Sequence, residues 1–191
     1  MAGESQTTTD YIRHHLTNLT YGKLPAGYQR LDHHGHVEET LEQPTWTFAH
    51  SSQEAKDMGF MAVHVDSMAW SIGLGFLFVL FFARMAKKAT AGVPRGWQNV
   101  VEMLIDFIDN TVRDAFHHKN KLVAPLALTV FMWILLMNTM DLFPVDWLPL
   151  LAAKISGDPH IPFKIVPTTD PNITVGMAIA VFILMLFFSV K

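Results

Sequence analysis

Residues 122–140 read LVAPLALTVFMWILLMNTM, a run of 19 residues without Asp, Glu, Lys, Arg or His. At about 1.5 Å of rise per residue, a helix of this length covers about 28 Å, and the hydrocarbon core of a bilayer is about 30 Å thick. Residues 67–83 and 172–190 form two further runs of this kind, of 17 and 19 residues. We therefore predict three transmembrane helices, at about 63–83, 122–140 and 172–190.

The composition agrees with a membrane location. Apolar residues make up 50% of the 191 residues and charged residues only 16%, against about 25% charged residues in a soluble domain. Residues 1–62 are polar and contain Pro25 and Pro44, which interrupt regular structure. The sequence thus predicts an all-α membrane domain at 63–191 behind an irregular polar N-terminal tail at 1–62.

Charge and motif content exclude several classes of function. The 14 Lys and Arg are outnumbered by 17 Asp and Glu and are spread along the chain, so no basic surface is available for nucleic acid. The absence of cysteine excludes disulfides, thiolate metal sites and cysteine nucleophiles. No serine-hydrolase, zinc-protease, P-loop or kinase motif is present. We expect neither a cofactor nor enzyme activity from this chain on its own.

Basic residues near the ends of the spans predict the orientation, because cytoplasmic loops are enriched in Lys and Arg. Residues 84–121 contain seven Lys and Arg, whereas residues 141–171 contain two beside four Asp. We expect residues 84–121 in the cytoplasm and the loop at 141–171 on the outer side. Three spans then put the N-terminal tail outside and residue 191 in the cytoplasm.

The predicted cytoplasmic segment contains an amphipathic pattern. Apolar residues recur with a period near 3.6 at Trp97, Val100, Val101, Leu104, Ile105, Ile108, Val112 and Phe116. Charged residues of both signs, four of them acidic, occupy the other face. The pattern predicts a helix at about 94–117, and its acidic content favours packing against helices or subunits over attraction to anionic lipid.

Polar residues gather near the outer ends of the predicted spans. They are Asp66, Asn138, Asp141, Asp146 and Asp170. Carboxylates at one membrane face raise the local cation concentration and relay protons. A structural interpretation stays open, because Asp66 and Asp170 also suit helix N-caps and Asn138 suits a hydrogen bond between two helices.

Small residues form a stripe on the first predicted span. Ser67, Ser71 and Gly75 recur at four-residue steps, and such a stripe lets a second helix approach closely. The pattern predicts a helix contact without identifying the partner helix.

The sequence HHGH at 33–36 offers imidazole ligands for zinc or copper. It lacks a framework of carboxylates or cysteines, and histidine-rich segments also bind metal incidentally. A metal-responsive membrane receptor is the hypothesis that this motif would support, and we assign no metal site to it.

Several longer motifs carry a family resemblance. They are GVPRGWQ from residue 92, VRDAFH from 112, KLVAPLALT from 121, LMNTMDLFPVDWLP from 136 and KIVPTTDPNIT from 164. From about His14 to Lys191 the chain resembles subunit a of bacterial F-type ATP synthases, most nearly the gammaproteobacterial form.

The resemblance implies a noncatalytic stator subunit in the bacterial inner membrane, with the N-terminus in the periplasm. Such a subunit takes protons from the periplasm through a half-channel to a rotor ring of subunit c, and it contacts the peripheral-stalk subunit b and membrane lipids. The resemblance puts Asn138, Asp141, Asp146 and Asp170, with Asp66 nearby, at the periplasmic proton uptake. It also implies that Lys164 holds Asp170 or a neighbouring acid by an ion pair.

The family continues into long helices that face the rotor and carry an essential arginine, and the 191 residues contain no such segment. We therefore expect the chain to represent the N-terminal two-thirds of the subunit. The alternative is a three-span scaffold or assembly protein that does not conduct ions.

Overall fold

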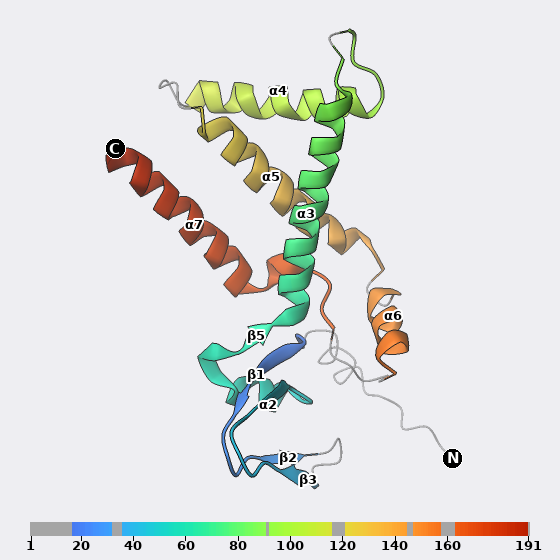
Figure 1. The fold of residues 1–191 in the computed structure, drawn as a ribbon, viewed down its shortest axis with the longest axis vertical. Helices are drawn as coiled ribbons and strands as arrows, with labels where there is room; N and C mark the ends of the chain where they lie inside the picture. The colour runs from blue at the N-terminus through green and yellow to red at the C-terminus, as the bar shows by residue number, and fades with distance from the viewer. Residues whose placement is uncertain are drawn as a thin grey trace. The chain divides into compact units, whose positions relative to one another are not determined.

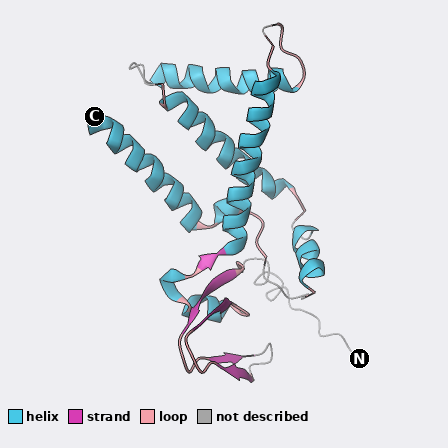
Figure 2. Cartoon of the chain, in the orientation of Figure 1, coloured by secondary structure: helices cyan, strands magenta, loops and turns pink. Residues whose placement is uncertain are grey.

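The structure is a computed structural model that describes residues 17–31, 36–90, 92–115, 121–144, 147–157 and 163–190. The chain divides into two compact units. One contains residues 1–70 and 143–191, and the other contains residues 71–142. Figure 1 traces the chain from blue to red, and Figure 2 separates its helices from its strands by colour.

Short strands form much of the chain between residues 20 and 64 (Figure 2). They are β1 (Thr20–Leu24), β2 (Gln29–Leu31), β3 (Val37–Thr40), β4 (Thr45–Phe48) and β5 (Val63–His64). One antiparallel sheet has the order β4-β1-β5, and β2 pairs with β3 in a second sheet.

The prediction of an all-α protein with an irregular tail is therefore wrong for these described residues. The inward positions of β1 are Thr20, Gly22 and Leu24, and two of these three side chains are small or polar. A strand is recognised in a sequence by alternating apolar and polar residues. Because β1 lacks that alternation, only its pairing with neighbouring strands reveals it.

A small core stabilises this first sheet. Leu24, Leu41, Ala49 and Met58 are buried and form one cluster. Gly22 allows β1 to pack closely against the Met58 side chain, since a Cβ atom at Gly22 would lie 2.8 Å from Cβ and Sδ of Met58. The strands of this sheet are thus stabilised by a core of their own, and we call the described residues of 20–64 the N-terminal module.

Two short helices complete this module before the first long helix begins. In α2 (Ser52–Asp57), the N-cap Ser51 accepts a hydrogen bond from the backbone of Glu54. The Glu54 carboxylate in turn accepts from the backbone N–H of His50 at 2.9 Å. The two bonds satisfy one backbone donor in the first turn and one on the residue that precedes the N-cap. The 3-10 helix η1 (Gly59–Met61) follows and leads to β5.

The stretch predicted as a loop at 141–171 is not irregular throughout. It contains the 3-10 helix η2 (Met140–Leu142), the helix α6 (Trp147–Ser156) and the 3-10 helix η3 (Pro167–Thr169). In α6, Pro149 falls in the first turn, where a missing N–H costs little. The helix α7 (Pro171–Val190) follows.

The described residues of the second unit lie mainly in helices. The helix α3 (Val65–Lys88) continues into it from the first unit and is followed by α4 (Trp97–Ala115) and α5 (Val123–Thr139). The predicted amphipathic helix at 94–117 is observed as α4, and residues 116 and 117 lie outside the described residues. Ring contacts hold α4 in place, with Phe107 and Phe131 at 6.0 Å and Phe81 and Trp97 at 6.0 Å between centroids.

Two helices in the described part of the chain are long and apolar enough to cross a membrane. They are Val65–Lys88 and Val123–Leu142, which correspond to the first two predicted spans. The third predicted span coincides with α7, whose described side chains form a shorter apolar helix, Pro171–Phe187. Its role as a span stays a prediction.

The small-residue stripe on α3 receives a side chain from α5 of the same chain. The indole Nε1–H of Trp133 donates to the backbone carbonyl of Ser71 at 2.7 Å. A Cβ atom on Gly75 would lie 3.0 Å from Cε2 of that ring. The absence of a side chain at Gly75 therefore gives the indole room to lie against α3.

Candidate functional site

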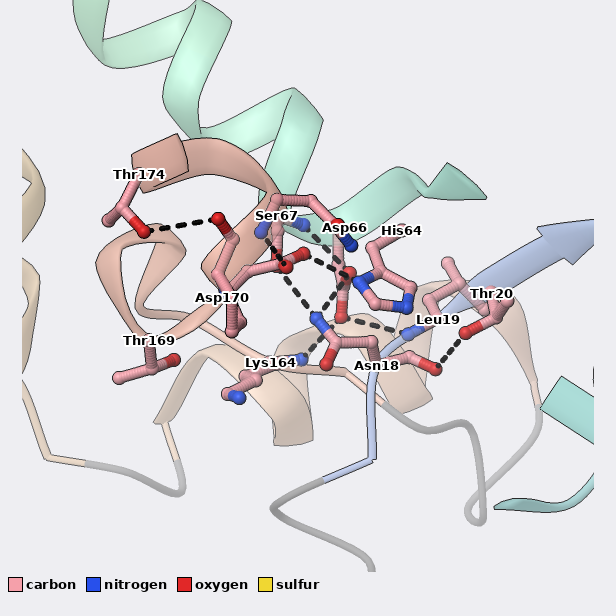
Figure 3. Close-up of polar contacts among 12 residues, drawn as sticks. Asn18, Leu19, Thr20, His64, Asp66, Ser67, Lys164, Thr169, Asp170 and Thr174 are labelled. Carbon is pink, nitrogen blue, oxygen red and sulfur yellow. Dashed lines mark hydrogen bonds and ion pairs between the residues drawn. The ribbon is translucent and has the colours of Figure 1, made fainter. Parts of the chain in front are cut away.

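The first unit contains a cluster of polar side chains around the start of α3 (Figure 3). At its centre lies Asp66, a residue of the first helical turn that is only 2% exposed. Its Oδ2 accepts hydrogen bonds from the backbone N–H groups of Leu19 and Lys164, both at 2.9 Å. Its Oδ1 accepts from the backbone of Ser67 at 2.7 Å and from Nδ2 of Asn18 at 3.3 Å.

The pairing of β1 with β5 explains why these groups meet. In this pairing Thr20 lies opposite His64, and the backbone N–H of Val65 donates to the carbonyl of Leu19 at 2.9 Å. Asn18 and Leu19 are thereby held over the first turn of α3. Nδ2 of Asn18 also donates to the Ser67 hydroxyl at 2.7 Å. Because a helix N-terminus carries unpaired N–H groups and a positive dipole, a carboxylate is stabilised there.

The second buried carboxylate is Asp170, at the start of α7. It is 2% exposed, and its Oδ1 accepts from the backbone N–H of Asn172 at 3.0 Å. Its carbonyl accepts from the N–H of Ile173, and Pro171 occupies the first helical position. The N-cap interpretation is therefore confirmed for Asp170. It is not supported for Asp66, which lies in the first turn of α3 and whose Oδ1 accepts from the N–H of the next residue, Ser67, and not from an N–H two or three residues further on.

A histidine covers the second carboxylate. Nδ1 of His64 lies 2.5 Å from Oδ2 of Asp170, and the imidazole is 30% exposed while the carboxylate side chain is 1% exposed. In Figure 3 the Lys164 ammonium group points away from both aspartates. Lys164 reaches Asp66 through its backbone, so the ion pair expected of its side chain with Asp170 is replaced by the contact with His64.

Sequence reasoning missed three members of the cluster as site residues, namely Asn18, His64 and Ser67. A histidine two residues before an aspartate at the start of an apolar run was a usable signal for His64. Nothing in the local sequence marks Asn18, because its partners Asp66 and Ser67 are 48 and 49 residues away.

The remaining predicted site residues are not in this cluster's unit or are not described. Asn138 lies in the last turn of α5 and Asp141 in η2, both in the second unit, and both are exposed. Asp146 lies outside the described residues. Of the six predicted site residues, the first unit brings together Asp66, Lys164 and Asp170.

The motif HHGH at 33–36 is mostly outside the described residues, with only His36 described. Within the described ranges, no group of three or more His, Asp or Glu side chains could hold a metal ion.

The geometry assigns different chemical capacities to the two carboxylates. The oxygens of Asp66 already accept four hydrogen bonds, so an added proton would have to displace a donor. Asp170 faces an imidazole, and histidine is the side chain that most readily exchanges protons near neutral pH. Asp66 is therefore suited to hold together three chain segments, those of Leu19, Ser67 and Lys164. The pair of His64 and Asp170 is suited to proton transfer.

Comparison with known proteins identifies the family. Residues 68–191 match the family model described as ATP synthase A chain. The chain is 57% identical over all 191 residues to ATP synthase subunit a of Teredinibacter turnerae and to that of Saccharophagus degradans, and covers 61% of each. It is 54% identical over 186 residues, or 97% of its length, to the subunit of Pseudomonas savastanoi pv. phaseolicola and covers 58% of it.

The chain thus spans about three-fifths of the length of these relatives. The resemblance inferred from the sequence motifs is confirmed over the whole chain. With more than half of its residues matched by the family model, the chain belongs to the ATP synthase A chain family.

Proposed function

We propose that this chain acts within subunit a of an F-type ATP synthase, as a noncatalytic part of the membrane stator that admits protons from the periplasm. Family membership and two helices long enough to cross a membrane support the proposal. The subunit c ring, the peripheral-stalk subunit b and lipids are its proposed partners. The proposed location is the bacterial inner membrane, with the N-terminal segment in the periplasm and residues 84–121 in the cytoplasm.

The observation that carries the proton-uptake proposal is the contact between His64 and Asp170. A carboxylate that is 1% exposed is costly to ionise without a partner. The adjacent His64 imidazole, when protonated, compensates the negative charge of the Asp170 carboxylate. The imidazole is 30% exposed. A proton taken up by His64 therefore has a short transfer to Asp170, away from solvent.

The proposal gives the other site residues distinct roles. Asp66 is a positioning residue that holds Leu19 and Lys164 at the start of α3 through their backbone N–H groups. Asn138, Asp141 and Asp146 are the proposed continuation of the uptake path.

The experiment is Asp170→Asn in the protein assembled in its native membrane. Asparagine is as good an N-cap as aspartate, so α7 is preserved while the group loses its capacity to carry a proton. We expect the rate of ATP synthesis driven by an imposed pH gradient to fall roughly tenfold or more, with an unchanged amount of assembled complex.

The matched control is Asp106→Asn on α4, which changes an exposed aspartate outside the cluster. It should leave the rate unchanged. If Asp170→Asn also leaves the rate unchanged at normal assembly, the cluster has a structural role only, and the scaffold alternative is favoured.

A further inference from the structure

The sheet β4-β1-β5 has two unlike faces. In an antiparallel sheet, side chains of successive residues alternate between faces and directly paired residues share one. Thr20, Gly22 and Leu24 of β1 point to the buried face, where Leu24 joins the core. Tyr21 and Lys23 therefore point to the opposite face.

The opposite face is apolar and aromatic. Tyr21 pairs with Phe48 on one side and with Val63 on the other, and Lys23 pairs with Trp46. We name the four residues Tyr21, Trp46, Phe48 and Val63 the aromatic face. The Tyr21 ring lies 5.0 Å from that of Phe48 and 5.8 Å from that of Trp46, between centroids.

This face is open to the surroundings in the structure. Trp46 is 49% exposed, Phe48 45% and Val63 37%. Burial of large apolar side chains is favourable, so leaving several of them in water is unfavourable. A contiguous exposed apolar patch marks a surface that contacts a membrane or another protein.

The position of the aromatic face in the chain favours a membrane. β5 runs directly into α3 (Figure 1), and Val63 is two residues before Val65, where α3 begins. Two residues span at most about 7 Å, and the headgroup layer on each side of a bilayer is roughly 5–7 Å thick. The edge of the sheet is therefore tethered at the depth where the apolar helix meets the headgroups.

Two more apolar side chains lie in the same short connection. Phe60 in η1 is 100% exposed and Met61 is 70% exposed. They are five and four residues before the first residue of α3. Neither contributes to the core of the first unit, so both are available to a lipid surface.

We propose that the aromatic face, together with Phe60 and Met61, lies in the phospholipid headgroup layer of the leaflet at which α3 begins. The proposal rests on the proposed membrane insertion of α3. Tryptophan and tyrosine are enriched at this depth because their rings are apolar and their N–H and O–H groups are polar. Lys23, beside Trp46, supplies a cation for a lipid phosphate.

No cysteine lies in these 191 residues, so single cysteines can be introduced here for labelling once any cysteines elsewhere in the complex have been replaced. Single spin labels are attached at Phe48→Cys and Phe60→Cys in the otherwise complete protein, reconstituted with its complex into phosphatidylethanolamine and phosphatidylglycerol vesicles. The readout is collision with oxygen, which enriches in lipid, relative to collision with a water-soluble nickel chelate. Ser52→Cys, an exposed residue of α2, is the matched aqueous control.

A fourth label, Phe76→Cys in the middle of α3, separates this inference from the proposed function. We expect the label at Phe76→Cys to report lipid and the label at Ser52→Cys to report water. At Phe48→Cys and Phe60→Cys, the preference for oxygen over the nickel chelate should be several-fold above that at Ser52→Cys. If Phe76→Cys reports lipid while Phe48→Cys and Phe60→Cys match Ser52→Cys, the inference is wrong and membrane insertion stands. If Phe76→Cys reports water, membrane insertion itself is wrong.

Shielding of Phe48→Cys and Phe60→Cys from both reagents would mean that a protein covers the face, which also overturns the inference.

A second measurement avoids cysteine altogether. Lipids brominated near the headgroup should quench part of the tryptophan fluorescence of the native protein. Trp46→Phe should remove the part that is quenched. Equal quenching of the two proteins would contradict the proposal.

Discussion

Nδ1 of His64 lies 2.5 Å from Oδ2 of Asp170, which joins two residues that are 106 positions apart in the sequence. His64 ends β5 immediately before α3, and Asp170 is the N-cap of α7. The contact therefore ties the starts of two apolar helices together. It also links a partly exposed imidazole to a buried carboxylate.

The first prediction concerns His64→Gln. The amide can still donate a hydrogen bond to Asp170, but it cannot take up and release a proton, so we expect gradient-driven ATP synthesis to slow by about tenfold. Imidazole added to the outer medium should restore part of the rate in vesicles. His50→Gln, an exposed histidine outside the cluster, should behave as wild type. A normal rate in His64→Gln would exclude this histidine from proton uptake.

The second prediction concerns Asp66→Asn. An amide cannot accept all four hydrogen bonds of Asp66, because its NH2 group would face an N–H donor of Leu19, Lys164 or Ser67. Each buried donor left unpaired costs about 1–3 kcal/mol. We expect a lower midpoint of thermal unfolding in detergent. Asp141→Asn, at an exposed position, should leave the midpoint unchanged. An equal midpoint in both variants would contradict the positioning role proposed for Asp66.

The third prediction concerns Gly75→Ala. The new Cβ atom would lie 3.0 Å from Cε2 of Trp133, so the indole must shift and its hydrogen bond to the Ser71 carbonyl is weakened. Overpacking of this kind costs about 1–3 kcal/mol, which thermal unfolding of the purified protein would detect.

Gly73→Ala provides the control for this prediction, because no other part of the described chain lies within 4 Å of the Cβ position at Gly73 on the same helix. We expect no loss of stability there. In a double-mutant cycle, Trp133→Phe should reduce the cost of Gly75→Ala. Equal effects of the two alanine substitutions would show that the indole does not depend on Gly75.

The fourth prediction concerns Tyr28. Burial, together with the hydrogen bond that its hydroxyl donates to Asp57 at 2.7 Å, raises the pKa of Tyr28 from 10.0 to about 12. The pKa is higher in the folded than in the unfolded chain, so the stabilisation is complete below pH 10.0 and is lost as the pH rises toward about 12.

Near-ultraviolet titration of the tyrosinate absorbance tests this prediction. The chain has three tyrosines, and Tyr28→Phe should remove the component that titrates last. Tyr21→Phe should retain it. A late component that survives Tyr28→Phe would contradict the assignment.

The parts of the fold that could be predicted are those set by local sequence. The apolar runs that became α3 and α5, and the apolar stripe that became α4, were predicted because length and a 3.6-residue period are visible along a helix. The strands between residues 20 and 64 were missed because β1 has Gly22 and Thr20 on its inner face. Their burial comes from partners that are distant in sequence, such as Met58.

The candidate site divides in the same way. Asp66 and Asp170 could be selected from the sequence because each is an acid at the start of an apolar run. The different roles of the two carboxylates could not be predicted from the sequence. Four donors fill the oxygens of Asp66, one of them the backbone of Lys164, 98 residues away, while Asp170 faces His64. The sequence by itself thus determined the family and the apolar helices, which depend on local composition. Only the tertiary structure decided which carboxylate has its oxygens filled by four donors and which faces an imidazole, because hydrogen-bond partners are set by the pairing of distant segments.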